Sequence, residues 1–223
     1  MLVADAQEAN TIVQKVLDDL AVCIPQSGDQ GVTARTAIGD LKAQAYLLLR
    51  QDLIGPPLLD CFEQVRAAGA SRGQLDWVRT QVSSIATPVQ LGGALMQNSC
   101  IQLCLAMEAD IIENMVFTSY QDVQILIQSL TQPFEDAIEI AADEMDQMTF
   151  QGLINLAAAV VNYLVTTARP LPRLVQYEFA AVLPTLVIAY RLYADAGRAD
   201  EVRDENKIIH PAFCPVKGVA LSA

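Results

Sequence analysis

Apolar residues recur at the spacing of an α-helix through the first third of this chain. The first apolar stripe runs from Asp5 to Val22, and Pro25 with Gly28 closes the element. We expect a second helix, capped by Thr33, to extend toward the GPP sequence that begins at Gly55. Shorter helices are expected at 58–67 and 74–85.

The middle of the chain predicts longer helices. The stretch from Gly92 to Met115 is apolar around much of its circumference, which is typical of a central helix. Ser119 is expected to cap the next helix, and Pro133 is expected to break or kink it. A further helix is expected from Thr149, as its opening residue, to Thr166.

The period changes after Arg169. Residues Leu174–Phe179 alternate between two faces and lie between prolines, which predicts a strand. Pro184 suits the first turn of a helix, and a turn at Gly197 introduces a short helix that ends at Asn206. The apolar positions expected to face inward on the first of these helices are Leu186, Val187, Tyr190, Leu192 and Tyr193.

These elements predict a mainly α protein. A helical, bundle-like domain is expected over residues 1–168, followed by a small module over 169–223. The module should run strand, helix, helix, extended segment, because the residue before Pro211 avoids the helical region. This order is similar to that of a LysM module.

Charge and hydropathy narrow the function classes. The net charge of −12 and the pI near 4.4 disfavour direct nucleic-acid binding, because phosphate backbones are repelled. The mean hydropathy of +0.30 is high, but the best apolar run, Leu153–Val165, is short and contains asparagines. We therefore predict no membrane span. Asp5 and Glu8 stand where a secretory signal needs positive charge, so we expect no export by that route.

The candidate chemical groups favour structural roles. Cys100 and Cys104 lie one helical turn apart, but a single histidine leaves too few soft ligands for a metal site. The five cysteines are therefore expected to be buried, reduced thiols, and no metal or cofactor is predicted. An acidic run is expected to be a solvated helix face or a surface for a basic partner. It contains Glu135, Asp136, Glu139, Asp143, Glu144 and Asp146.

The last quarter of the chain carries a specific motif, from the tyrosine of RLYADAGRADE to the leucine of KGVAL. It resembles the C-terminal end of the DNA circularisation proteins of Mu-like phages and prophages, which close with the pattern YGDA-RADE followed by RN-I-HP-FVPGG-LEVL. Members of that family are longer, so the chain is expected to be a C-terminal portion or a shortened relative. The matching residues are Tyr193, Asp195, Ala196, Arg198, Ala199, Asp200, Glu201, Asn206, Ile208, His210, Pro211, Phe213, Pro215, Gly218 and Leu221.

The resemblance implies a structural component of a contractile phage tail or baseplate. Such a protein acts by assembly and not as an enzyme, with copies of itself and other tail or baseplate proteins as partners. It is expected in the host cytoplasm during assembly and in the virion tail afterwards. Two alternatives remain open, a LysM-like peptidoglycan-binding module attached to a helical domain and an enzyme such as a helical lytic transglycosylase.

Physical chemistry predicts structural roles for the motif residues, at helix ends and in a turn. Arg198 and Asp200 should open the second short helix, where Asp200 favours the positive end of the helix dipole. Asn206 is expected to end that helix in a left-handed conformation. His210 is expected to donate a ring N–H to a carbonyl and fix the turn into Phe213, which should pack inward.

Overall fold

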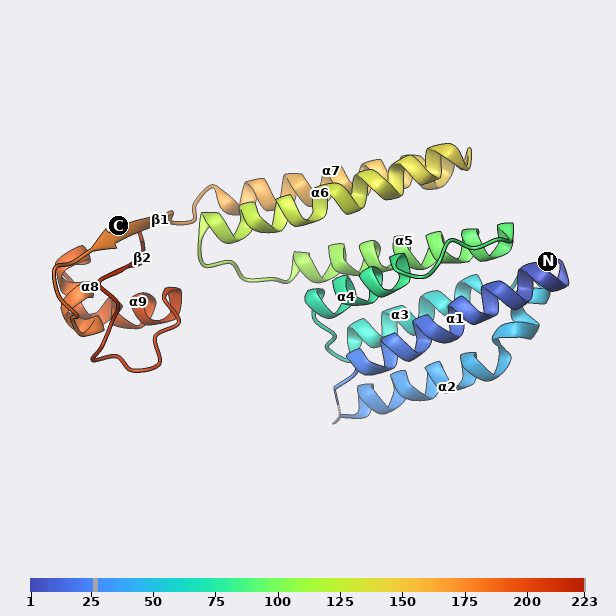
Figure 1. The fold of residues 1–223 in the computed structure, drawn as a ribbon, viewed down its shortest axis with the longest axis horizontal. Helices are drawn as coiled ribbons and strands as arrows, with labels where there is room; N and C mark the ends of the chain where they lie inside the picture. Colours follow the sequence, from blue (N-terminus) through green and yellow to red (C-terminus); the bar gives the residue numbers. More distant parts are fainter. Residues whose placement is uncertain (26–27, 223) are drawn as a thin grey trace. The chain divides into compact units, whose positions relative to one another are not determined.

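The computed structural model describes residues 1–25 and 28–222 and confirms a mainly α fold with a small two-stranded sheet near the C-terminus (Figure 1). The chain forms two compact units. The first comprises residues 1–115 and 131–160, and the second comprises 116–130 with the chain from 161 onward. These units divide within two long helices, whereas the sequence places its boundary at residue 169, just after the second of them ends.

Five helices build most of the first unit. They are α1 (Val3–Cys23), α2 (Asp29–Arg50), α3 (Gly55–Ala67), α4 (Arg72–Ser83) and α5 (Leu91–Glu113). Helix α5 packs against α1, α3 and α4, which confirms its predicted central place. The apolar stripe predicted for the first helix is buried on α1, including Ile12, Val16 and Leu20.

Polar side chains fix where these helices start. Ser71 and Gln74 form a capping box at the beginning of α4. The Glu8 carboxylate of α1 accepts hydrogen bonds from the backbone N–H groups of Val89 (2.9 Å) and Gln90 (2.7 Å) at the start of α5. The prediction that Thr33 caps the second helix is wrong, because α2 already begins at Asp29.

Two long helices follow, α6 (Tyr120–Asp143) and α7 (Gln147–Ala168). The hydroxyl of Ser119 accepts from the backbone N–H of Asp122 at 3.1 Å, which confirms the predicted cap of α6. Helix α6 continues through Pro133, so the expected break is absent. Asp146, and not Thr149, caps α7, because its carboxylate accepts the backbone N–H of Thr149 at 3.1 Å.

The C-terminal module contains strand β1 (Leu174–Glu178) and strand β2 (Lys217–Leu221), which pair antiparallel with Leu174 opposite Leu221. Between them lie α8 (Thr185–Tyr193), the 3-10 helix η1 (Ala196–Arg198) and α9 (Ala199–Glu205). The predicted order of strand, helix, helix and extended segment is confirmed. Its core is formed by Tyr177, Ile188, Ala189, Val202, Cys214 and Ala220.

The predicted inner face of α8 is partly wrong. Leu186, Val187 and Tyr190 are exposed, whereas Ile188 and Ala189 are buried. The helix has nine residues, of which only Thr185 and Arg191 are not apolar or aromatic, so its own spacing does not define which face meets the sheet.

Candidate functional site

The motif residues at the junction of α8 and α9 form a brace inside the C-terminal module. The guanidinium carbon of Arg198 lies 3.7 Å from the centre of the Tyr193 ring. Its Nε and Nη2 donate to the carboxylate of Glu201 at 3.0 and 2.7 Å, a bidentate ion pair. Burial raises the pKa of the Tyr193 phenol. Three residues of the motif therefore come together and hold each other in place.

Two aspartates of the motif shape the turn between these helices. Ala194 ends α8 in a left-handed conformation, with a φ of 58°. The side chain of Asp195 then accepts the backbone N–H of Gly197 at 2.8 Å and caps η1. Asp200 lies in the first turn of α9, as predicted, and pairs with Arg203 at 2.9 Å.

Asn206 acts on strand β2 instead of ending α9 in the predicted conformation. Its φ is −98°, and the left-handed residue is Lys207. The side-chain amide of Asn206 accepts the backbone N–H of Val219 at 2.8 Å and donates to the carbonyls of Val219 and Val202 at 2.7 and 2.8 Å. The amide thus ties the end of α9 to the outer edge of the sheet.

Gly218 and Tyr177 form a close contact that the motif only partly reveals. A β-carbon at Gly218 would lie 2.3 Å from the Asn206 Oδ1 and 2.5 Å from the Tyr177 Oη. Tyr177 is buried, and burial raises the pKa of its phenol. Gly218 belongs to the motif, but Tyr177 does not. The alternating position of Tyr177 in β1 is the only sequence signal for its place in this contact.

The HPAF part of the motif lies on the surface. Phe213 is 70% exposed and Ile209 is 99% exposed, so the prediction that Phe213 packs inward is wrong. The ring of His210 lies 5.2 Å from that of Phe213, and its Nδ1 accepts the Ala212 backbone N–H at 3.3 Å, whereas we predicted that it donates. The carbonyl of Pro211 accepts the N–H of Thr185 at 2.7 Å, which anchors this loop to the start of α8.

A second exposed apolar segment lies beside this loop. Leu183 and Cys214 form an isolated antiparallel bridge, in which Cys214 is buried and Leu183 is half-buried, while their neighbours Val182 and Phe213 are exposed. We call the exposed apolar residues of both segments the loop surface. They are Val182, Leu186, Tyr190, Ile209 and Phe213. Large exposed apolar side chains gathered on one module are typical of an interaction surface.

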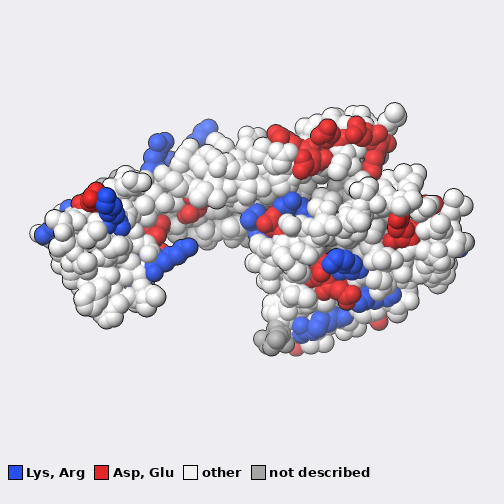
Figure 2. Space-filling model, in the orientation of Figure 1, with Lys and Arg blue, Asp and Glu red and all other residues white. Residues whose placement is uncertain are grey.

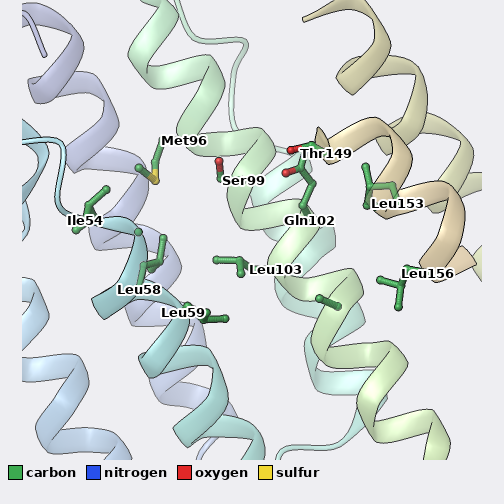
Figure 3. A pocket seen from close by; sticks show the side chains of 13 residues that line it. Ile54, Leu58, Leu59, Met96, Ser99, Gln102, Leu103, Thr149, Leu153 and Leu156 are labelled. Carbon is green, nitrogen blue, oxygen red and sulfur yellow. The ribbon is translucent and has the colours of Figure 1, made fainter. Parts of the chain in front are cut away.

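The first unit holds an apolar groove between α3, α5 and α7 (Figure 3). Its volume is about 510 Å³, and Leu58 and Leu103 face the same space as Leu153 and Leu156. Its polar lining side chains are Ser99, Gln102 and Thr149. None of the lining residues is an acid, a base or a thiol, so the groove offers contact area, and its hydroxyls, Ser99 and Thr149, have no lining residue that could activate them as nucleophiles.

An ion cluster between α4 and α5 was missed in the sequence. Glu108 is fully buried, and its carboxylate accepts from the Arg79 Nε at 3.0 Å and from the Arg72 Nη1 at 3.3 Å. Arg79 also pairs with Asp76. Burial raises the pKa of Glu108, against the opposing influence of Arg79. The cluster ties α4 to the central helix, and the only sequence signal for it was an acid within an apolar stripe.

The cysteines are buried and free, as predicted. Burial raises the pKa of Cys100 to about 12 and, with the nearby Asp19, that of Cys23 to about 11. Such thiols are poor nucleophiles near neutral pH. Among the described residues, no group of three or more His, Cys, Asp or Glu side chains is placed to hold a metal ion.

The acidic residues predicted to form a solvated face are exposed along α6 and the following turn. Figure 2 shows acidic side chains gathered over the end of the α6–α7 hairpin. Helix α7 itself is long and apolar enough to cross a membrane by length and composition, and only 17% of its 18-residue apolar window is buried.

The motif residues therefore fall into four places: the brace, the turn shaped by Asp195 and Asp200, the sheet edge at Asn206, and the exposed HPAF loop. No protein-family model and no curated protein matches this chain.

Proposed function

We propose that this protein is a structural component of a contractile phage tail or baseplate and that it acts by protein–protein assembly. The proposal rests on the C-terminal motif, which resembles that of the Mu-like DNA circularisation proteins. Its partners are other tail or baseplate proteins and copies of itself, first in the host cytoplasm and then in the virion tail.

The observation that carries the proposal is that some motif residues stabilise the module while others are exposed on its surface. Tyr193, Arg198, Glu201 and Asn206 contact each other or the module's own backbone, so their job is internal. The HPAF loop instead leaves large apolar side chains in solvent, led by Phe213. A rigid module that presents an apolar loop is suited to docking against another protein.

The charges of the module favour a protein partner over a nucleic acid. Of the seven lysines and arginines over residues 169–223, Arg198, Arg203 and Lys217 pair with a carboxylate of the same module, and the whole chain carries a net charge of −12. Neutralised cations gain little from phosphate contacts, because affinity for nucleic acid grows with the number of cations that engage phosphates.

Genetic complementation tests the proposal. A phage or prophage lacking this gene is complemented with the wild-type chain or with an Ile209→Asp, Phe213→Asp variant, and the particles are viewed by electron microscopy. We expect the null strain to lack complete tails, the wild-type chain to restore them, and the variant to fail while remaining folded. A matched Val22→Asp variant, with an exposed valine on α1, should restore tails.

Analysis of purified particles shows which result would contradict the proposal. Normal tails from the null strain, or particles that do not contain the chain, would contradict the proposal. A peptidoglycan pull-down separates it from the cell-wall alternative, which the strand, helix, helix, strand order of the module favours. Sedimentation with peptidoglycan that depends on the module would support that alternative instead.

A further inference from the structure

Helix α7 carries an apolar stripe that faces solvent. Ala158, Val161 and Val165 are exposed, and Ile154 is half-buried on the same face. Their spacing of four, three and four residues is that of a coiled-coil seam. The buried residues Leu153, Val160, Leu164 and Ala168 lie beside this stripe, about a quarter of a turn around the helix. The helix therefore has one broad apolar face, and its own fold covers one flank of it and leaves the other exposed.

The two ends of α7 carry opposite charges. Asp143, Glu144 and Asp146 immediately precede its first turn, whereas Arg169 and Arg173 follow its last residue. All five side chains are exposed, and none forms an ion pair among the described residues. No lysine or arginine occurs between Arg79 and Arg169, so the acidic end has no cation nearby in sequence.

We propose that two copies of the chain pair along α7 in antiparallel orientation. The arrangement is self-complementary, because the acidic end of each helix meets the basic end of the other. Centring the seam between Ala159 and Val160 places Ile154 opposite Val165 of the second copy and Ala158 opposite Val161 of the second copy. The same register brings the acidic end close to Arg173 of the second copy.

Charge complementarity selects a second copy as the occupant of this stripe. An unrelated apolar partner would cover the seam but would leave both charged ends unpaired, whereas an antiparallel copy pairs them in one step. A lipid bilayer would also cover the seam and would accommodate the charged ends at its two surfaces, but it would not pair the carboxylates with the arginines. The inference rests on the proposed assembly role. It identifies the contact between two copies of the chain in solution.

Charge reversal provides the decisive experiment on the full chain. Sedimentation velocity at low salt should show a dimer for the wild-type protein. An Asp143→Lys, Glu144→Lys variant and an Arg169→Glu, Arg173→Glu variant should each dimerise at least about tenfold more weakly, because like charges then meet at both ends. Mixing the two variants should restore a one-to-one heterodimer, because every end again meets its opposite.

The seam is tested separately from the ends. Val161→Glu should abolish the dimer, while Val22→Glu, which changes a more exposed valine on α1, should leave it intact. Circular dichroism and thermal unfolding of each variant check that the helices remain folded. The effect of charge reversal should fade at about 1 M salt, because exposed charges more than roughly 3 Å apart are then screened from each other.

Three outcomes would overturn the inference. They are a wild-type chain that stays monomeric up to high concentration, a dimer that Val161→Glu leaves unchanged, and flotation of the monomer with phosphatidylcholine vesicles in a Val161-dependent manner. The assembly role is judged separately by the complementation assay. A monomeric chain that is present in tails contradicts only this inference, whereas a dimer that is absent from particles contradicts only the assembly role.

Discussion

The side-chain amide of Asn206 pairs with the backbone of Val219 as a neighbouring strand would, accepting its N–H and donating to its carbonyl. Gln121 does the same at the other edge of the sheet, where its amide accepts the N–H of Leu174 at 2.8 Å and donates to its carbonyl at 3.5 Å. A two-stranded sheet is marginal by itself in water. The two side-chain amides therefore satisfy backbone groups at both outer edges of the sheet, where a neighbouring strand would otherwise pair.

Replacing Asn206 with aspartate should loosen β2. The carboxylate keeps the acceptor for the Val219 N–H but loses both donors and faces two carbonyl oxygens. We expect a cost of about 1–3 kcal/mol, from unsatisfied carbonyls, that is confined to the C-terminal module. Hydrogen exchange of the β1 and β2 amides measures it, and Asn162→Asp, an exposed asparagine on α7, is the matched control. Unchanged protection at Val219 would contradict the assigned role.

Gly218→Ala should be more harmful than any other glycine-to-alanine change in the module. The added methyl would overlap the Tyr177 phenol and the Asn206 side chain, both of which are held in place. We expect a loss of about 1–3 kcal/mol, as for other overpacked sites. Gly39→Ala is the control, because that position on α2 has open space and should gain about 0.5–1 kcal/mol. Equal effects of the two changes would refute the close contact.

The sequence predicted the elements far better than the contacts between them. Long amphipathic stripes such as that of α1 identify both a helix and its buried face, because many residues report the same period. The short α8 offers too few residues for this, so its spacing predicts Tyr190 inward although Ile188 and Ala189 form the core. Length therefore limited what periodicity could reveal.

The motif was recognisable in the sequence, but the roles of its residues were only partly so. Local signals correctly placed Asp200 at the start of a helix. Asn206 meets Val219 thirteen residues later, a contact that no local pattern encodes. The size and apolar character of Phe213 predict a buried side chain, yet the loop after Pro211 leaves it in solvent. Such tertiary placements depend on the folded chain as a whole.

Arg79 and Glu108 should behave as a coupled pair. Arg79→Met leaves a buried carboxylate with only Arg72 beside it, so we expect a loss of about 3–5 kcal/mol. The double variant Arg79→Met, Glu108→Met should recover much of that loss, because no buried charge remains. Urea unfolding followed by Trp77, the single tryptophan, is a suitable measurement because Trp77 lies on α4 beside the cluster. Additive losses in the double variant would show that the pair is not coupled.

Stability should also depend on pH through Glu108. Burial raises the pKa of this carboxyl in the folded state above its unfolded value of about 4.3. Between these two pKa values the folded state binds more protons than the unfolded state, so the free energy of unfolding falls as pH rises. The stability that Glu108 contributes is thus fully present below about pH 4.3 and is lost as pH rises through its folded pKa. The side chain of Glu108→Gln cannot titrate. As pH rises over that range, the unfolding free energy of the wild-type chain should therefore fall relative to that of the variant. Urea titrations of both proteins at a series of pH values measure this difference, and a constant or opposite trend would mean that Arg72 and Arg79 outweigh the cost of burial.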